Sequence, residues 1–238
     1  MRFFFIRHGQ STNNALYEAT GSDRGRSYDP DLTDVGRRQA EFLGEFLSKR
    51  NESQVIQEGR LEPEFRFTHL YTSLMIRSVA TASILAEKLG MPVYGWDIIH
   101  ENGGLYMGDE VTDHKMGQAG PGRHFFNTNF PKLILPDTLG EEGWWNRPYE
   151  AEEERPRRAR RFLDELMARH GSTQAHVAVV SHGGFYNELM NILLGMSTTG
   201  GYWFMLNNTG ITRVDISEVE IRVIYMNRLD FLPIDLVT

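Results

Sequence analysis

The 238-residue sequence contains no cysteine. Disulfide bonds, thiolate nucleophiles and zinc sites built on cysteine are therefore excluded together. Any enzymatic chemistry in this chain must use another nucleophile.

An excess of positive charge is also missing. The chain has 25 Lys and Arg against 32 Asp and Glu, a formal net charge of −7. This balance argues against a general nucleic-acid binder. A protein of this charge that handles anions must concentrate its positive charge locally, so each Arg near a candidate site is informative.

Long apolar runs are absent as well, and none approaches the length that spans a bilayer. The first strand begins within two residues of the amino terminus, which leaves no room for a secretion signal. We therefore expect no membrane association and a cytoplasmic protein. The length and an ordinary composition, 40% hydrophobic and 24% charged, predict a single domain over residues 1–238.

The stretch from Arg2 to Asn14 carries the first functional signal. Four apolar residues, Phe3 to Ile6, predict a buried strand, and Arg7-His8-Gly9 follows at its carboxyl end. Ligand crevices form at the carboxyl ends of parallel strands. There Arg offers a planar fork for a phosphate or carboxylate, and a neutral His offers a nucleophilic nitrogen.

The same design occurs a second time. The apolar run His176 to Ser181 is followed directly by His182 and Gly183. If the two strands are neighbours, both imidazoles reach one crevice. The coincidence therefore predicts one site that contains His8 and His182.

The rest of the chain alternates between helical and strand patterns, which predicts an α/β fold. We expect a three-layer α/β/α arrangement with a mostly parallel sheet. The expected elements are helices over about 33–49, 74–89, 150–170 and 185–194, and strands over 67–71, 93–99, 211–216 and 220–225. Residues 11–23 are expected to form polar turns, 51–64 a charged connection, and Thr72-Ser73 the cap of the second helix. The irregular stretch of about 102–149, rich in Gly, Pro and aromatic residues, is predicted to be a lid-like insertion over the crevice.

Arg77 falls in the first turn of an expected helix. A cation there opposes the positive end of the helix dipole. A bound anion would resolve this conflict, so Arg77 joins the candidate site.

Arg7, His8, Arg77 and His182 together suit a phosphoryl group. At this point the sequence resembles the histidine phosphatase superfamily, also called the phosphoglycerate mutase-like family. The matching motifs, in family order, are Arg7-His8-Gly9 with Ser11 and Asn14, Thr20-Gly21, Leu32-Thr33 with Gly36 and Gln39-Ala40, Tyr71-Thr72-Ser73 with Arg77 and Thr81-Ala82, and Ser181-His182-Gly183.

The resemblance implies the phosphoglycerate mutase-like fold and a mechanism. Neutral His8 would attack phosphorus and become a phosphohistidine, while Arg7, Arg77 and His182 would hold the charge of the transferred group. It further implies that Asn14, Ser11 and Gly183 contact phosphate or substrate, and that Thr20-Gly21 forms a substrate-contacting turn.

In this family a Glu soon after the third strand protonates the leaving group and then activates water. Glu101 stands in that place, although Asp97, Asp109 and Glu110 lie near it in the sequence. No group of residues demands a metal, so we expect no metal and no cofactor.

Three functions remain open. The favoured one is a phosphomonoesterase acting on a small phosphorylated metabolite. A cofactor-dependent phosphoglycerate mutase is the alternative, although such mutases usually carry an Arg and a Tyr-Gly behind the Glu, where this chain has Asn102-Gly103-Gly104-Leu105. A catalytically silent anion-binding regulatory module is the third. The oligomeric state, including a homo-oligomer, is left open.

Overall fold

A seven-stranded sheet forms the centre of the protein. The computed structural model describes residues 1–238 except 53, 58–59, 64, 110–111, 113 and 198–200. The strands run in the order β11-β10-β1-β9-β4-β5-β8. Their bounds are β1 Arg2–Arg7, β4 His69–Thr72, β5 Val93–Gly95, β8 Leu133–Ile134, β9 His176–Ser181, β10 Ile211–Ile216 and β11 Ile221–Arg228. Strands β1, β9, β4, β5 and β8 run parallel to one another, and β10 and β11 form an antiparallel edge of the sheet.

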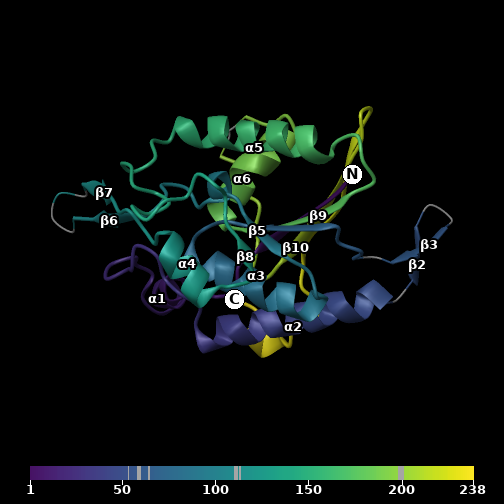
Figure 1. Cartoon of the computed structure of the whole chain (residues 1–238), viewed down its shortest axis with the longest axis horizontal. Coiled ribbons are helices and arrows are strands. Elements are labelled where there is room, and N and C mark those ends of the chain that lie inside the picture. The colour runs from purple at the N-terminus through teal and green to yellow at the C-terminus, as the bar shows by residue number, and fades with distance from the viewer. Residues whose placement is uncertain (53, 58–59, 64, 110–111, 113, 198–200) are drawn as a thin grey trace.

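Helices cover both faces of this sheet (Figure 1). Helices α2 (Asp34–Glu52) and α3 (Ile76–Leu89) lie on one face, and α5 (Glu154–His170) and α6 (Gly183–Leu193) lie on the other. The expected three-layer fold with a mostly parallel sheet is confirmed. Because both faces of β1 are covered, its four apolar residues are all buried.

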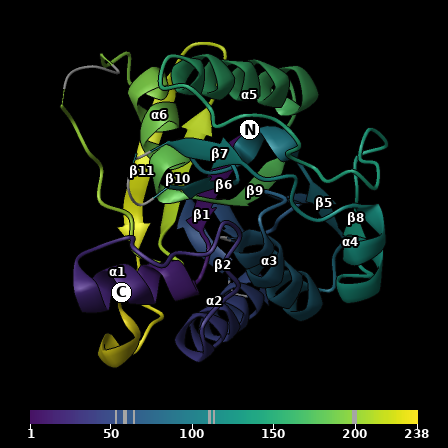
Figure 2. The ribbon, with the colours of Figure 1, turned by 90° about the vertical axis from the view of Figure 1, so that its left-hand side faces the viewer.

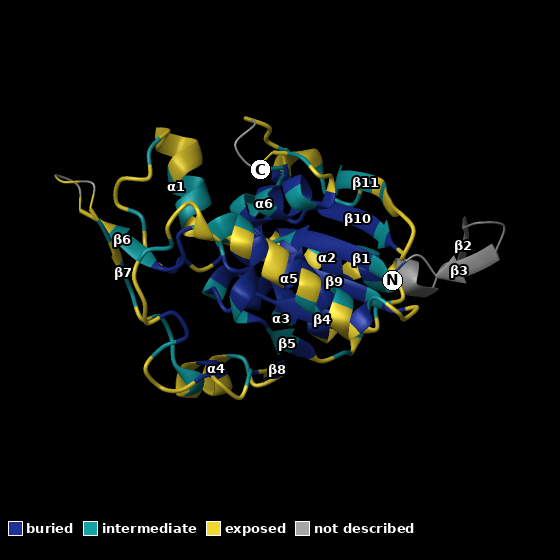
Figure 3. Cartoon of the chain, turned by 90° about the horizontal axis from the view of Figure 1, so that it is seen from above, coloured by how far each residue is buried: buried dark blue, intermediate teal, exposed yellow. Residues whose placement is uncertain are grey.

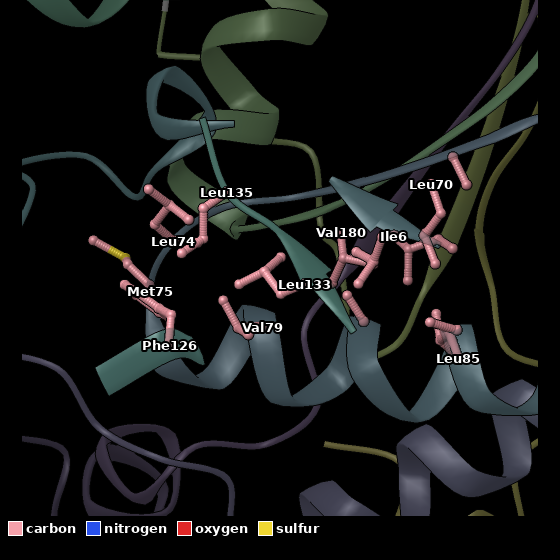
Figure 4. Packing of buried hydrophobic residues seen from close by; sticks show 14 of the residues in the cluster. Ile6, Leu70, Leu74, Met75, Val79, Leu85, Phe126, Leu133, Leu135 and Val180 are labelled. Carbon is pink, nitrogen blue, oxygen red and sulfur yellow. The ribbon is translucent and has the colours of Figure 1, made fainter. Parts of the chain in front are cut away.

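The sheet divides the hydrophobic core into two clusters. Phe4 and Ile6 pack into the cluster on the α2/α3 side. Figure 4 shows Ile6 in this cluster with Val79 and Leu133. Phe3 and Phe5 point into the α5/α6 side. In Figure 3 the strands lie buried beneath α5, whose outer face is exposed. Packing on both faces of the sheet thus fixes the position and direction of β1. The candidate site lies at the carboxyl end of this strand.

A helix, α1 (Thr12–Thr20), occupies the stretch that the sequence pattern assigns to polar turns. The pattern fails there because α1 has no buried residue and therefore no apolar stripe. A capping box begins the helix: Ser11 Oγ accepts from Asn14 N, and Asn14 Oδ1 accepts from Ser11 N. The Thr20-Gly21 turn is present as its end, where Gly21 takes a left-handed φ of 65°.

Three other expectations need correction. Met75, not Thr72 or Ser73, is the N-cap residue of α3, and its own side chain makes no capping hydrogen bond. The strand predicted over 93–99 stops at Gly95, and a short 3-10 helix, η1 (Asp97–Ile99), follows. Helix α5 begins at Glu154 instead of 150, because the preceding residues hold other contacts described below.

The insertion at 102–149 contains β6 (Tyr106–Gly108), β7 (Lys115–Gly117), α4 (Arg123–Asn129) and the sheet strand β8. Phe126, Leu133 and Trp145 pack into the core. This part of the chain therefore folds with the domain, and its role as a lid stays a prediction.

The charged connection expected over 51–64 contains a hairpin of β2 (Gln54–Gln57) and β3 (Arg60–Pro63), and residues 53, 58–59 and 64 of that stretch lie outside the described residues. Across the described residues, no helix has the length and apolar composition that crossing a bilayer requires.

We predict that Gly36→Ala disturbs the loop after β1. A Cβ at Gly36, in the first turn of α2, would lie 2.1 Å from the carbonyl oxygen of Gln10. Because that atom belongs to the backbone, the loop or the helix must shift, at a cost of about 1–3 kcal/mol. Urea unfolding should show this loss of stability.

Gly108→Ala, at an exposed position of β6, is the control. Its Cβ would meet nothing within 4 Å. Equal stabilities of the two variants would contradict the prediction.

Candidate active site

The two His-Gly motifs meet at the carboxyl ends of β1 and β9. These strands pair in parallel with Arg7 opposite Ser181, so His8 and His182 follow at the same level. Their ring centroids lie 5.1 Å apart, and both side chains are buried. The predicted proximity of the two imidazoles is confirmed. This end of the molecule, with α1, β6 and β7 around it, faces the viewer in Figure 2.

The hydrogen bonds of His8 define its tautomer. Nδ1 lies 2.6 Å from the carbonyl oxygen of Gly9, which can only accept, so Nδ1 carries the proton. Nε2 is therefore unprotonated, and its lone pair accepts from Nε of Arg77 at 3.0 Å. Burial, and then the charges of Arg77 and Arg7, lower the pKa of His8 well below its usual value. The ring is thus neutral and directs a nucleophilic nitrogen toward the cations.

Two buried guanidiniums supply positive charge beside that nitrogen. Arg7 donates from Nη1 to the carbonyl oxygen of Leu206 at 2.6 Å, and burial lowers its pKa to about 10. Burial also lowers the pKa of Arg77, and the charges of Asp29 and Glu101 partly oppose this effect. Arg7 remains a cation at neutral pH, as does the Arg77 guanidinium.

Among the residues that the structure describes, two buried nitrogen atoms of this cluster have no hydrogen-bond partner. They are Nε of Arg7 and Nδ1 of His182. His182 uses its other nitrogen, Nε2, with Ser73 Oγ at 2.9 Å. Buried polar atoms are seldom left unpaired, so these two mark positions that the oxygens of a bound anion would fill. The arrangement suits one tetrahedral phosphoryl group.

Glu101 belongs to the loop after η1, and its carboxylate lies at the start of α6. Its Oε1 accepts from the backbone N–H groups of Asn102 at 2.8 Å and Phe185 at 3.1 Å, and its Oε2 accepts from Gly184 N at 3.2 Å. Its charge acts on Arg7 and on Arg77. A carboxyl group is therefore present beside the phosphoryl position.

The neighbouring acids are placed differently. Asp97 lies in η1, where its charge acts on Arg147. Asp109 accepts from the backbone and hydroxyl of Thr112 in the β6–β7 hairpin. Glu110 lies outside the described residues. Of the three described acids, Glu101 is the one whose charge acts on both guanidiniums, and its role in proton transfer stays a prediction.

The remaining predicted substrate contacts lie around the cluster with other partners. Asn14 and Ser11 bond to each other in the cap of α1, and Asn14 Oδ1 also accepts from Asn208. Thr20 Oγ1 donates to the carbonyl of Leu16 at the exposed end of α1. Gly183 lies against Arg7: a Cβ there would be 3.7 Å from Arg7 Nε. Substrate contacts for all of these remain predictions.

Two residues that the sequence pattern did not single out also shape the site. Asn208, which is buried, donates to the carbonyl oxygen of His8 at 2.9 Å and so holds the nucleophile's backbone. Asp29, also buried, accepts from the N–H of Ile76 at the start of α3. Only the short Asn207-Asn208 and Asp29-Pro30 turn signals mark these positions in the sequence, and neither indicates a long-range contact.

Known proteins share the sequence pattern of this chain. The family model of the histidine phosphatase superfamily (branch 1) matches residues 3–228. The chain belongs to this superfamily. The predicted family is therefore confirmed, and with it the enzyme class, a histidine phosphatase, at the level of the superfamily.

Individual relatives are more distant. A protein named as a probable phosphoglycerate mutase, GpmB, of Yersinia enterocolitica is 26% identical over 226 residues, which cover 92% of this chain and 86% of that protein. The phosphoserine phosphatase of Entamoeba histolytica, solved with 3-phosphoglyceric acid, aligns with a TM-score of 0.60 at 20% identity over 98% of this chain and 99% of that one. The α-ribazole phosphatase of Shigella flexneri aligns with a TM-score of 0.61 at 19% identity over 96% of both chains. These structures share the fold of the superfamily.

Within the portion of the chain that the structure describes, no group of three or more His, Asp or Glu residues is placed to hold a metal ion. The positive charge at the site comes from the two guanidiniums.

We predict that Gly184→Ala displaces Glu101. A Cβ at Gly184 would lie 2.3 Å from Glu101 Oε1, so the carboxylate must leave the start of α6. We expect kcat to fall at least about tenfold, which steady-state kinetics with a phosphate ester would measure. Gly140→Ala, whose Cβ would meet nothing closer than 3.5 Å, is the control. Unchanged turnover in Gly184→Ala would show that the position of Glu101 does not matter.

A second prediction concerns Asp29. Burial raises its pKa to about 7 from the usual 3.8. The folded protein therefore retains a proton that the unfolded chain releases, and stability falls as the pH rises from about 4 to about 7. Asp29→Asn should remove this loss.

The stability of the variant relative to wild type should rise between pH 5 and pH 8 by at least about 1.4 kcal/mol, the value of one pKa unit. Urea unfolding at both pH values would measure it. Asp23→Asn, at an exposed position, is the control variant. A flat difference for Asp29→Asn would show that Asp29 is ionised in the folded protein near pH 5.

Proposed function

We propose that the chain is a phosphomonoesterase that hydrolyses a small phosphorylated metabolite through a phosphohistidine on His8. The observation that carries the proposal is the unprotonated Nε2 of His8, which accepts from Arg77 and lies in a cluster with two buried nitrogens that have no hydrogen-bond partner among the described residues. A neutral nucleophile surrounded by preorganised cations is what phosphoryl transfer requires.

The reaction has two halves. His8 Nε2 forms a bond to phosphorus while the ester P–O bond breaks, and Glu101 gives a proton to the leaving oxygen. Glu101 then takes a proton from water, whose oxygen bonds to phosphorus as the N–P bond breaks, and phosphate leaves. Oε2 of Glu101 accepts one N–H bond against two at Oε1, so Oε2 is better placed to carry the proton.

A cavity linked to the site through Arg26 is a candidate place for the rest of the substrate. Arg26 donates to the hydroxyl of Tyr106, and its charge acts on Arg77. Arg26, Tyr106 and Lys115 line this cavity of about 290 Å³, and so do Asp23 and Asp109. A substrate whose phosphate lies at Arg77 would place its remaining atoms toward Arg26.

A mutase is the second candidate, because the Yersinia relative carries that name. The mutase would return the phosphoryl group to a phosphoglycerate instead of to water. The Asn102-Gly103-Gly104-Leu105 sequence behind Glu101 favours water, since it lacks the basic and tyrosine residues that mutases of this family usually place there.

The proposal predicts that His8→Ala loses at least about a thousandfold in kcat on a generic phosphate ester, because the nucleophilic nitrogen is removed. His124→Ala, which removes an exposed imidazole on α4, should retain activity. Wild-type enzyme quenched during turnover should carry phosphate that is lost in acid and retained in base, as expected for phosphohistidine.

Three results would contradict the proposal. Acid-stable phosphate on the protein would indicate another nucleophile. Transfer to 3-phosphoglycerate that needs a bisphosphate primer and outpaces hydrolysis would indicate the mutase. Tight phosphate binding without turnover of any ester in a panel of phosphorylated metabolites would indicate a silent module.

A further inference from the structure

Arg158, a buried residue of α5, lies behind the site and touches none of the residues proposed to hold phosphate. All five of its guanidinium N–H groups have acceptors. Nε and Nη2 bond to the two carboxylate oxygens of Glu150 at 2.5 and 2.9 Å. Nη1 donates to the carbonyl oxygens of Ile98 and His100, and Nη2 also donates to Oδ1 of Asn102.

These acceptors flank Glu101 on both sides. His100 precedes it and Asn102 follows it, so one planar group holds both neighbours of the candidate acid. Glu150 adds a further contact, since its Oε2 accepts from Gly103 N at 3.1 Å. Its own N–H donates to the carbonyl oxygen of Gly103 at 3.1 Å.

The pair of Arg158 and Glu150, here called the clamp, also contacts the start of α6, which holds the Glu101 carboxylate. The guanidinium carbon of Arg158 lies 4.9 Å from the ring centroid of Phe185, whose N–H donates to Glu101 Oε1. Arg158 therefore contacts the loop that bears the carboxylate and the helix end that receives it.

Stability alone does not explain this pair. The side chains of Arg158 and Glu150 are only 8% and 7% exposed, and burying an ion pair often costs as much as it gains. What a rigid fork with five satisfied donors does supply is orientation.

We propose that Arg158 and Glu150 are positioning residues that hold the Glu101 carboxyl at the distance that proton transfer to the leaving group needs. This rests on the proposed function, in which Glu101 is the acid. It goes beyond that function by assigning the precision of proton transfer to two residues that never contact substrate.

The leaving group provides a specific readout. p-Nitrophenolate departs from phosphorus without a proton, whereas the alkoxide of glycerol 2-phosphate requires one. A misplaced acid should therefore slow phosphoenzyme formation from the alkyl ester and leave formation from the aryl ester nearly unchanged. A general loss of folding or of phosphate binding would slow both.

The experiment measures phosphoenzyme formation in single turnovers for Glu150→Gln, Arg158→Lys and Arg158→Met. We expect a loss of at least about 30-fold with glycerol 2-phosphate and less than about threefold with p-nitrophenyl phosphate. Arg158→Lys should fall between wild type and Arg158→Met, because an ammonium group cannot reproduce the fork. Arg160→Met, at an exposed position of the same helix, is the matched control and should behave as wild type.

Glu101→Gln is measured in parallel to separate the two proposals. If it shows the leaving-group dependence and the clamp variants do not, the clamp proposal is overturned and the proposed function stands. If Glu101→Gln shows no such dependence, Glu101 is not the acid and both assignments fall. Equal losses on both esters in the clamp variants would mean a purely structural role. Thermal melting checks folding, and Glu150→Gln, which keeps the shape of the side chain, decides the test if Arg158→Met does not fold.

Discussion

The hydrogen bond from Nε of Arg77 to Nε2 of His8 is the interaction on which the site depends. It fixes the lone pair of the imidazole toward the guanidinium, and the Gly9 carbonyl fixes the opposite nitrogen as the protonated one. The bond joins α3 to the end of β1, which lie far apart in the sequence. It forms only because the α2/α3 core seats both elements on the sheet.

The two guanidiniums explain why a protein with a negative net charge can receive an anion at this site. Burial of the Arg7 and Arg77 guanidiniums disfavours their charge. The charge of Glu101 offsets part of this cost for both, and the charge of Asp29 offsets part of it for Arg77. Neither acid forms a hydrogen bond with the two guanidiniums in the described contacts, so the forks are not neutralised in place. A bound phosphoryl group would complete the charge balance and fill the unpaired atoms of Arg7 and His182.

Sequence reasoning located the parts of the site that follow apolar strands or known motifs. The repeated apolar run with His-Gly predicted the contact of His8 with His182, since parallel strands end at the same edge of the sheet. The conflict with the helix dipole indicated Arg77. Glu101, by contrast, came from the family resemblance, because nothing in its own neighbourhood separates it from Asp97 or Asp109.

The parts of the structure that the sequence did not indicate depend on polar contacts, which leave no periodic pattern in the sequence. Helix α1 shows no apolar stripe because it buries nothing, and its cap is the only strong local signal. Asn208 holds His8 across 200 positions of the chain, and Arg158 gathers acceptors some 60 positions away. The charge pattern of α5 indicates a solvated helix, although Arg158 lies on its buried side. Such contacts depend on the packing of whole elements, which local pattern does not encode.

This contrast explains how the site divides its work. The nucleophile extends from a central strand, whose position is set by packing on two faces. The candidate acid lies on a loop outside the sheet, at the neck of the 102–149 insertion, and its side chain is only half-buried. A loop can place a carboxyl group with the precision of a strand only if its neighbouring residues are tied down. Arg158 and Glu150 tie them from outside, so the accuracy of proton transfer depends on residues that the substrate never meets.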